Sequence, residues 1–313
     1  MIKGKVLFID TTHPLLSQIL EEAGFECCHF SFTQKAEYEP VIHDFDVLII
    51  RSKFYIDELF LDKAKKLKII GRVGSGLENI DLQAAAKRNI KCLNSPEGNR
   101  DAVGEHTVGM LLSLNNKLSI ADSQVRKGLW IREGNRGNEL REKTVGIIGF
   151  GNMGSSFAEK LIGFGCKIIS YDKYKTQYAP DYVTETDLES LISQSDIISL
   201  HVPLTNETEF MIDSNFLKKC KTGVIIINTS RGKILKTSDL VNALKTGKVS
   251  GACLDVLEFE DTSFEKAPSQ NPVLDWLYQC DKVILTPHIA GWTQESNFKL
   301  SKVLAEKIIS CYF

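Results

Sequence analysis

Short apolar segments alternate with amphipathic segments along the first hundred residues. The apolar segments are rich in Val, Ile, Leu and Phe, and each is followed by a stretch with the character of an amphipathic helix. This alternation predicts βαβ units and therefore a parallel sheet. The expected strands lie at 5–10, 25–30, 46–50, 68–74 and 90–94, and the expected helices at 15–24, 56–67 and 80–89.

A second series of the same kind begins at residue 144. Its strands are almost wholly apolar, as expected when helices cover both faces of a sheet. Because a chain of 313 residues is longer than one core usually grows, the two series predict two α/β domains, each with a doubly wound parallel sheet. The second-series strands are expected at 144–151, 166–172, 196–202, 223–230, 251–256 and 282–288, and its helices at 153–165, 187–194 and 238–247.

Three further segments connect or complete the two series. Apolar positions at helical spacing predict one long connecting helix from Asp101 to about Ser119. The polar stretch 126–143, with its single Trp130, is predicted to be an exposed arm or a connection between domains. Residues 293–313 are predicted to form one amphipathic helix after the last strand.

The sequence GIIGFGNMG contains a G-x-G-x-x-G pattern between a predicted strand and a predicted helix. Gly149 permits a tight turn, Gly151 lets the backbone approach a pyrophosphate, and Gly154 lets the helix pack against the strand. The helix N-terminus then receives the anion. Such a pattern alone is weak, but its position here predicts a dinucleotide site, which also includes Asn152 and Met153.

Asp172 ends the next predicted strand, at the distance where an acidic side chain would bind the adenosine ribose 2′-hydroxyl. A carboxylate there would repel a 2′-phosphate, so NAD is favoured over NADP, although Lys173 and Lys175 lie beside it. The alternative is that Asp172 only ends the strand.

A second glycine turn, Gly74-Ser75-Gly76, also lies between a predicted strand and a predicted helix, but Asn79 replaces its third glycine. Such a turn at a helix start could hold a smaller anion such as a carboxylate, or it could be an ordinary loop.

Three ionisable residues follow apolar segments of the second series, where open parallel sheets place their ligand sites: Arg231, Glu260 and His288. A neutral imidazole can accept a hydroxyl proton near physiological pH, and a neighbouring carboxylate favours its charged form. An arginine can hold a substrate carboxylate and polarise a carbonyl. Together they predict oxidation of a 2-hydroxy acid, whereas each residue alone is more simply explained as a loop residue.

Charge and composition favour a small-molecule partner. The 38 Lys and Arg residues against 40 Asp and Glu residues give a net charge of -2, without a basic cluster for nucleic acid. No apolar segment approaches membrane-spanning length, and the chain starts without the pattern of a secretory signal. The eight cysteines show neither zinc-site nor disulfide spacing, so we expect no metal, reduced thiols and a cytoplasmic protein.

With these motifs the sequence resembles the D-isomer-specific 2-hydroxyacid dehydrogenase family. The matching segments cover nearly the whole chain: RVGSGLENID, AVGEHTVGMLL, GIIGFGNMG, LHVPLTNET, INTSRG, ACLDV and LTPHIAGWT. The resemblance implies that Arg231, Glu260 and His288 are the catalytic arginine, glutamate and histidine, and that Asp255 contacts the nicotinamide carboxamide. It further implies substrate binding by Ser75 and Gly76 and cofactor contacts from His201, Val202, Pro203 and Thr229.

The same resemblance implies a domain organisation. A flavodoxin-like substrate domain would comprise residues 1–98 and 289–313, and a Rossmann NAD-binding domain, residues 99–288, would be inserted in it. The helices near Asp101 and at the end of the chain would cross between the domains, and closure of a hinge would exclude water from the substrate. A homodimer formed through the NAD-binding domain and the arm 128–137 is implied likewise.

The sequence IIRSKFYI bears on the substrate. Arg51 and Ser52 resemble the arginine and serine with which phosphoglycerate dehydrogenases bind their substrate, and an arginine beside a hydroxyl suits a phosphate. Phe54 and Trp292 depart from that pattern. The leading prediction is NAD-dependent oxidation of 3-phospho-D-glycerate to 3-phosphohydroxypyruvate, in serine biosynthesis. The alternatives are an unphosphorylated 2-hydroxy or 2-keto acid as substrate, or an NAD-sensing protein similar to co-repressors of this family.

Overall fold

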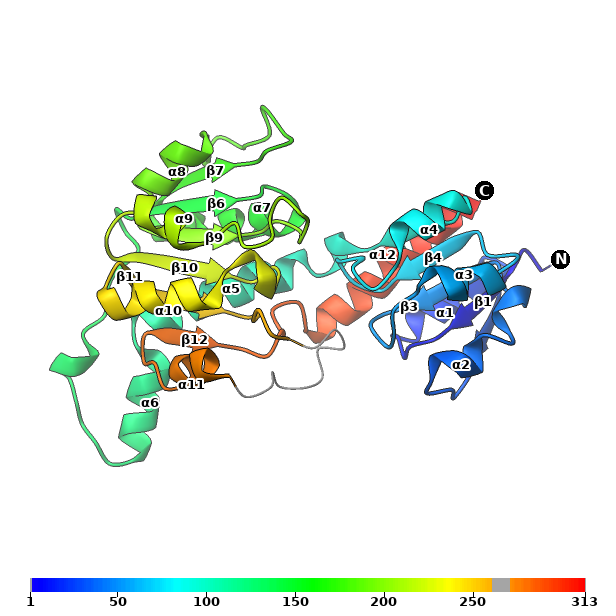
Figure 1. The fold of residues 1–313 in the computed structure, drawn as a ribbon, viewed down its shortest axis with the longest axis horizontal. Helices are drawn as coiled ribbons and strands as arrows, with labels where there is room; N and C mark the ends of the chain where they lie inside the picture. The colour runs from blue at the N-terminus through cyan, green and yellow to red at the C-terminus, as the bar shows by residue number, and fades with distance from the viewer. Residues whose placement is uncertain (1, 261–270, 313) are drawn as a thin grey trace. The chain divides into compact units, whose positions relative to one another are not determined.

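The computed structural model describes residues 2–260 and 271–312. These residues form two compact units (Figure 1). Unit 1 contains residues 2–100 and 292–312, and unit 2 contains residues 101–260 and 271–291. The chain thus passes from one unit to the other after Arg100 and after Gly291, where we predicted domain boundaries after 98 and 288.

Unit 1 is built on a five-stranded sheet in which all neighbouring strands are parallel. Its strand order, β2-β1-β3-β4-β5, is that of flavodoxin-like doubly wound sheets, which confirms the predicted fold class for this part of the chain. The strands are β1 (Lys5–Phe8), β2 (Glu26–His29), β3 (Val47–Ile50), β4 (Ile69–Arg72) and β5 (Lys91–Asn94).

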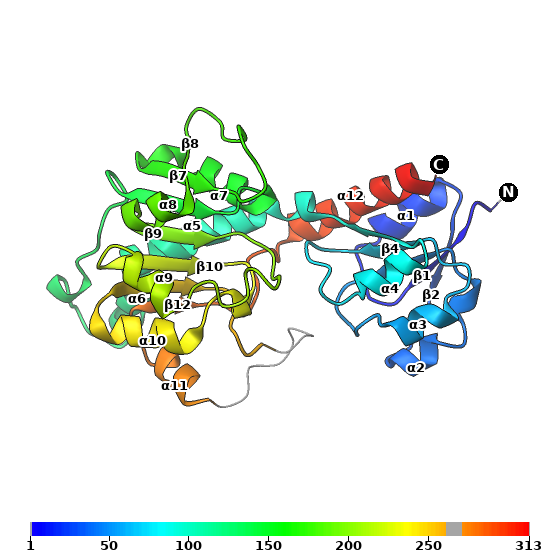
Figure 2. The same cartoon turned by 45° about the horizontal axis from the view of Figure 1, so that its top comes forward.

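Helices cover both faces of this sheet, because successive strand residues point to opposite sides. Val6 and Phe8 pack under α1 and α12, which lie side by side (Figure 2), whereas Leu7 and Ile9 pack with α2, α3 and α4. The helices are α1 (Leu15–Glu22), α2 (Lys35–Tyr38), α3 (Glu58–Lys63), α4 (Leu82–Lys87) and α12 (Gln294–Tyr312), with 3-10 helices η1 (Ile42–Asp44) and η2 (Pro96–Gly98).

Unit 2 contains a seven-stranded parallel sheet in the order β12-β11-β10-β9-β6-β7-β8. The six strands from β8 to β11 have the arrangement of a Rossmann fold, and β12 extends the sheet. The predicted fold class is therefore confirmed here as well. The strands are β6 (Thr144–Ile148), β7 (Lys167–Tyr171), β8 (Thr184–Glu185), β9 (Ile197–Leu200), β10 (Val224–Asn228), β11 (Val249–Leu254) and β12 (Val283–Leu285).

The sheet of unit 2 is buried on both faces, which explains its almost wholly apolar strands. Helices α8 to α11 cover one face, and α5 and α7 cover the other (Figure 1). The helices are α5 (Arg100–Asn115), α6 (Leu118–Arg126), α7 (Asn152–Leu161), α8 (Leu188–Gln194), α9 (Ser214–Lys219), α10 (Thr237–Thr246) and α11 (Pro272–Tyr278), with 3-10 helices η3 (Glu133–Asn135), η4 (Ile162–Phe164) and η5 (Gly232–Ile234).

The prediction of one helix from Asp101 to Ser119 is wrong. Lys117 adopts a left-handed conformation with φ of 53°, which no α-helix accommodates, so α5 ends before it and α6 starts after it. The arm that follows carries Trp130 with 81% of its surface exposed. Among the helices of the described ranges, none combines the length and apolarity needed to cross a membrane.

Candidate functional site

The glycine turn between β6 and α7 has the geometry of a phosphate cradle. Gly149 has a φ of +90°, and a Cβ there would lie 2.6 Å from the His201 carbonyl oxygen. A Cβ at Gly154 would overlap the Gly149 carbonyl oxygen, whereas a Cβ at Gly151 would meet no described atom within 4 Å. No side chain caps α7, which begins at Asn152, so its first N–H groups point toward this open space. The turn therefore fits the pyrophosphate of a dinucleotide.

Asp172 lies immediately after β7, beside this turn. Its carboxylate accepts the Phe150 N–H at 2.9 Å and the Tyr174 N–H at 3.0 Å. Lys175 donates to the Phe150 carbonyl at 2.8 Å, and Lys173 pairs with Glu207 at 2.7 Å. The two lysines that could have attracted a 2′-phosphate are thus both engaged, while Asp172 is held in place.

The segment after β9 adjoins Gly149 through its backbone. The His201 side chain points into the core, where its Nε2 lies 2.8 Å from the Ser199 hydroxyl. Burial lowers the pKa of His201 to about 3, so the ring is neutral. Any cofactor contact of His201 would therefore come from its backbone, with Val202 and Pro203 next along the chain.

Two other predicted cofactor residues lie near helix α5. The Thr229 hydroxyl lies 3.3 Å from that of Thr107. His106 lies one residue earlier, with Nε2 3.1 Å from the Thr286 hydroxyl and 3.6 Å from Asp255 Oδ1. Neither His106 nor Thr286 was predicted, because a helix residue and a strand-end residue meet only in the folded sheet.

His288 and Glu260 form a pair in unit 2. His288 Nδ1 lies 2.9 Å from Glu260 Oε2, and the other carboxylate oxygen, Oε1, accepts the Leu257 N–H. Both side chains are largely buried. With Nδ1–H donating to the carboxylate, Nε2 is the basic nitrogen of the neutral ring. The structure therefore brings together two of the three predicted catalytic residues as a hydrogen-bonded pair.

Asp255 holds the segment that carries His288. Its side chain is 1% exposed and accepts hydrogen bonds from the Thr286 hydroxyl, the Ile289 N–H and the Ala290 N–H, at 2.6, 2.9 and 2.8 Å. The Asp255 carbonyl also accepts the His288 N–H at 2.7 Å. These contacts keep His288 in a left-handed conformation with φ of 55°. Contact of Asp255 with a nicotinamide stays a prediction.

Arg231 follows β10, and its backbone is fixed by a buried asparagine. Asn228 donates from Nδ2 to the Arg231 carbonyl at 2.9 Å, and its Oδ1 accepts from the Ser230 hydroxyl at 2.7 Å. A Cβ at Gly232 would overlap the Leu257 carbonyl oxygen. Gly232 thus lets the Arg231 turn lie directly against the loop that carries Glu260.

In unit 1, Arg51 lies at the carboxyl end of β3. Its N–H donates to Asp10 at 2.5 Å, and its carbonyl accepts from Asn79 Nδ2 at 2.9 Å. Its guanidinium lies 4.4 Å from the centre of the Trp292 ring. Burial lowers the pKa of Arg51, although the guanidinium stays charged. Ser52 is the next residue, half-buried.

The loop of Gly74, Ser75 and Gly76 follows β4. We predicted that this turn lies at the start of a helix, but helix α4 starts later. Asp81 caps that helix by accepting the Ala84 N–H at 2.8 Å. The Ser75 hydroxyl donates to Asn99 at 2.6 Å. A Cβ at Gly74 would overlap the guanidinium of Arg72, a residue that our prediction treated only as part of the strand. A carboxylate at this loop would bind to loop N–H groups beside an arginine.

Two neighbours of Arg51 serve the fold of unit 1. The Lys53 ammonium donates to the carbonyls of Ile9 and Phe32 and lies 3.3 Å from the Tyr38 hydroxyl. Phe54 packs against Tyr38 and Phe60 in the core. Both side chains thus have partners within unit 1.

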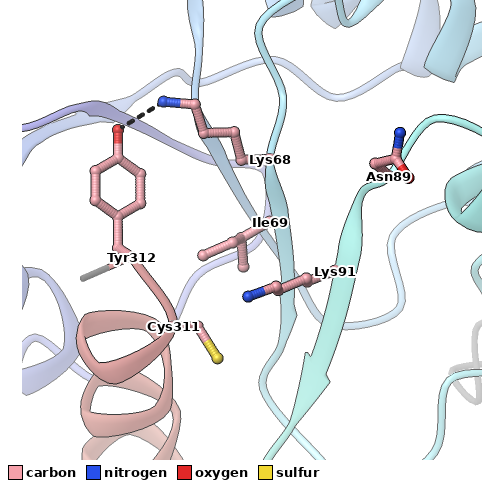
Figure 3. Close-up of a pocket in the computed structure, with 6 residues that line it drawn as sticks. All are labelled: Lys68, Ile69, Asn89, Lys91, Cys311 and Tyr312. Atoms are coloured by element: carbon pink, nitrogen blue, oxygen red, sulfur yellow. Dashed lines mark hydrogen bonds between the residues drawn. The ribbon is translucent and has the colours of Figure 1, made fainter.

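A hollow of about 210 Å³ lies at the amino-terminal ends of β4 and β5 in unit 1 (Figure 3). Lys68 and Lys91, at the amino-terminal ends of β4 and β5, line it together with Cys311 and Tyr312. The Lys68 ammonium pairs with Asp46 at 3.0 Å. Because the hollow lies at the amino-terminal ends of these strands, it is separate from Arg51 and the glycine loop, which follow the carboxyl ends of β3 and β4. Within the part of the chain that the structure describes, no His, Cys, Asp or Glu cluster could hold a metal ion.

Comparisons with known proteins agree with this geometry. Residues 108–290 match the family model "D-isomer specific 2-hydroxyacid dehydrogenase, NAD binding domain". The chain is 39% identical to a hydroxypyruvate reductase of Thermotoga maritima over 88% of this chain and 87% of that protein. It is 36% identical to a D-3-phosphoglycerate dehydrogenase of Methanocaldococcus jannaschii over 97% of this chain but only 56% of that protein.

The solved structures agree as well. A D-lactate dehydrogenase of Aquifex aeolicus, crystallised with NAD and lactic acid, superposes with a TM-score of 0.84 and 30% identity over 97% of this chain and 94% of that one. The chain spans about half the length of the phosphoglycerate dehydrogenases that it matches. By its sequence, its two parallel sheets and its nucleotide turn, the chain belongs to the NAD-dependent D-isomer-specific 2-hydroxyacid dehydrogenase family.

Proposed function

We propose that His288, Glu260 and Arg231 interconvert a short anionic D-2-hydroxy acid and its 2-keto acid. The observation that carries this proposal is the His288–Glu260 pair, 2.9 Å apart, in the unit that also holds the nucleotide turn. NAD, when bound at that turn, supplies the hydride acceptor. In this proposal, the hydroxyl proton that leaves with the hydride is accepted by His288, and the charge that develops on the imidazole is stabilised by Glu260.

In the oxidation direction, His288 Nε2 accepts the proton of the substrate's 2-hydroxyl group as the hydride leaves C2. The C2–H and O–H bonds break, the C2 carbonyl forms, and the ring becomes an imidazolium. Glu260 stabilises that charge through Nδ1–H. In the reduction direction the same imidazolium returns its proton to the oxygen.

Arginine and backbone groups hold the substrate in this scheme. Arg231 binds the substrate carboxylate and polarises the C2 carbonyl, since a guanidinium offers a fixed fork of donors. The N–H groups of the Ser75 and Gly76 loop, beside Arg72, bind the carboxylate from unit 1. Arg51 binds the group at the far end of the substrate.

The leading substrate is 3-phospho-D-glycerate. Arg51 at the end of β3, followed by the Ser52 hydroxyl, supplies donors suited to a phosphate. Relatives that are D-3-phosphoglycerate dehydrogenases align with up to 97% of this chain. The product would be 3-phosphohydroxypyruvate.

Hydroxypyruvate is the second candidate. The Lys53 ammonium donates to two backbone carbonyls, so it is less available to bind a substrate phosphate. The relative with 39% identity, which this chain covers over 87% of its length, is a hydroxypyruvate reductase. A single arginine with a serine hydroxyl also suits an uncharged terminal hydroxyl group.

Initial rates measured by NADH absorbance test both candidates. We expect turnover of 3-phospho-D-glycerate with NAD, and of hydroxypyruvate with NADH at lower kcat/KM than 3-phosphohydroxypyruvate. D-lactate, D-2-hydroxyglutarate and the L-isomers complete the panel. Higher kcat/KM for hydroxypyruvate than for 3-phosphohydroxypyruvate would replace the first candidate by the second, and no turnover of any of these acids would overturn the proposal.

A further inference from the structure

Trp292 has no role in the scheme above, yet it contacts the residue proposed to bind the far end of the substrate. The Arg51 guanidinium lies over its ring at 4.4 Å, a cation–π distance. Trp292 is 68% exposed, so the ring is not needed to fill the core of unit 1. A large exposed aromatic side chain against a partly buried arginine calls for another explanation.

The stacking decides which donors of Arg51 can be used. With its Cζ 4.4 Å from the ring centroid, the guanidinium is shielded on the side of Trp292, whereas N–H donors directed away from the ring stay available to a ligand. Among the described residues, the guanidinium makes one recorded hydrogen bond, from Nη1 to the Thr11 carbonyl at 3.4 Å. The backbone of Arg51 is already fixed by Asp10 and Asn79. Trp292 therefore restricts the part of Arg51 that the backbone contacts leave mobile, which is its side chain.

We propose that Trp292 is a positioning residue that holds the Arg51 guanidinium for binding a second anionic group of the substrate. This inference rests on the proposed function and names its specificity: 2-hydroxy acids that carry a phosphate or carboxylate beyond C2. An oriented guanidinium binds such a group through two parallel N–H donors. A substrate without a second anion makes no such pair with Arg51, so its binding depends much less on Trp292.

Four variants test the inference: W292A, W292F, R51Q and the double variant R51Q/W292A. KM and kcat are measured with 3-phospho-D-glycerate, with D-2-hydroxyglutarate and, in reverse, with hydroxypyruvate. We expect W292A to raise KM for the better of the two acids with a second anionic group by about tenfold, within the roughly 2- to 30-fold range of a cation–π contact. In W292A, the kcat, the KM for NAD and the KM for hydroxypyruvate should stay within about twofold of the wild-type values. W292F should keep most of the substrate affinity, because its ring can still contact the guanidinium.

The double variant separates positioning from direct contact. If Trp292 acts through Arg51, W292A has no further effect on KM in the R51Q background. Trp276, whose ring lies 5.2 Å from the Lys245 ammonium in unit 2, provides a matched control. W276F removes no contact with Arg51, and its substrate KM should equal that of the wild type.

Three results would overturn the inference: independent, multiplicative effects of R51Q and W292A, an equal rise in KM for hydroxypyruvate, or turnover by the wild type of hydroxypyruvate but of neither acid with a second anionic group. In each of these cases the wild type still oxidises or reduces a 2-hydroxy or 2-keto acid. Failure of the proposed function looks different, because the wild type itself would turn over no acid of the panel.

Discussion

His288 combines three features at one residue: a left-handed backbone, a carboxylate on Nδ1 and a position beyond the last strand of the unit 2 sheet. A non-glycine residue with positive φ is costly unless its surroundings hold it there. Asp255 supplies that support through the N–H groups of the two residues after His288. The imidazole is thereby held in one orientation, which would reduce the reorganisation needed in the proton transfer that we propose.

Replacing the imidazole tests this assignment. H288A should lower kcat by about 100- to 10,000-fold, the usual contribution of a positioned acid or base. NADH binding, followed by fluorescence titration, should persist because the nucleotide turn is untouched. His43, an exposed histidine of unit 1, provides the control, and H43A should retain full turnover. A kcat of H288A close to that of the wild type would refute the role.

At the scale of elements, the β6–α7–β7 unit brings the glycine turn and Asp172 side by side. The glycine turn places the N–H groups of α7 toward open space, and β7 delivers Asp172 beside the same turn. We predict that the charge at this position favours NAD over NADP. Lys173 cannot easily receive a 2′-phosphate, because Glu207 accepts from it and from the Tyr174 hydroxyl.

Removing the Asp172 carboxylate should weaken NAD binding and relax discrimination against NADP. For D172A we expect KM for NAD to rise by roughly tenfold or more, the contribution of a hydrogen bond to a charged group. The ratio of kcat/KM for NAD over NADP should fall. Asp181, exposed in the loop between β7 and β8, gives the matched control variant D181A. An unchanged ratio in D172A would contradict the prediction.

Local pattern predicted most of these elements, but not every contact between them. The glycine turn and Asp172 could be predicted, since both depend on spacing within one βαβ unit. The adjacency of Glu260 and His288 could not, because it depends on β11 and β12 being neighbours in the sheet. The break at Lys117 was missed because apolar positions at helical spacing continue across it. The contact of the Arg72 guanidinium with Gly74 was missed because the pattern of a strand does not show where the side chain of its last residue lies.

For the whole molecule, buried His201 links stability to pH. Burial lowers the pKa of His201 from 6.5 to about 3, and its Nδ1 has no hydrogen-bond partner among the described residues. Between these values the unfolded chain binds a proton that the folded protein does not. Stability from this source is therefore complete above about pH 6.5 and is lost as the pH falls toward 3.

The variant H201Q should retain more of its stability in acid. From pH 7 to pH 5, the free energy of unfolding should fall by about 2 kcal/mol more in the wild type than in H201Q. This difference corresponds to about one proton bound by the unfolded wild-type chain over roughly 1.5 pH units. Urea titrations at both pH values measure this difference. H43Q, which removes an exposed histidine, should behave as the wild type does. Equal losses in the wild type and H201Q would exclude the linkage.

The order of the units along the chain also has a consequence for synthesis. The residues of α12 that cover the unit 1 sheet, Leu300, Leu304, Ala305 and Ile308, follow all of unit 2 in the sequence. During translation, domains generally fold as units once they have emerged from the ribosome. Unit 2 can thus fold while the chain is still growing, whereas the sheet face of Val6 and Phe8, which α1 and α12 share, is only partly covered until α12 is made. Unit 1, although it is made first, is completed last, and its uncovered face is the part of the nascent chain that a chaperone would have most reason to protect.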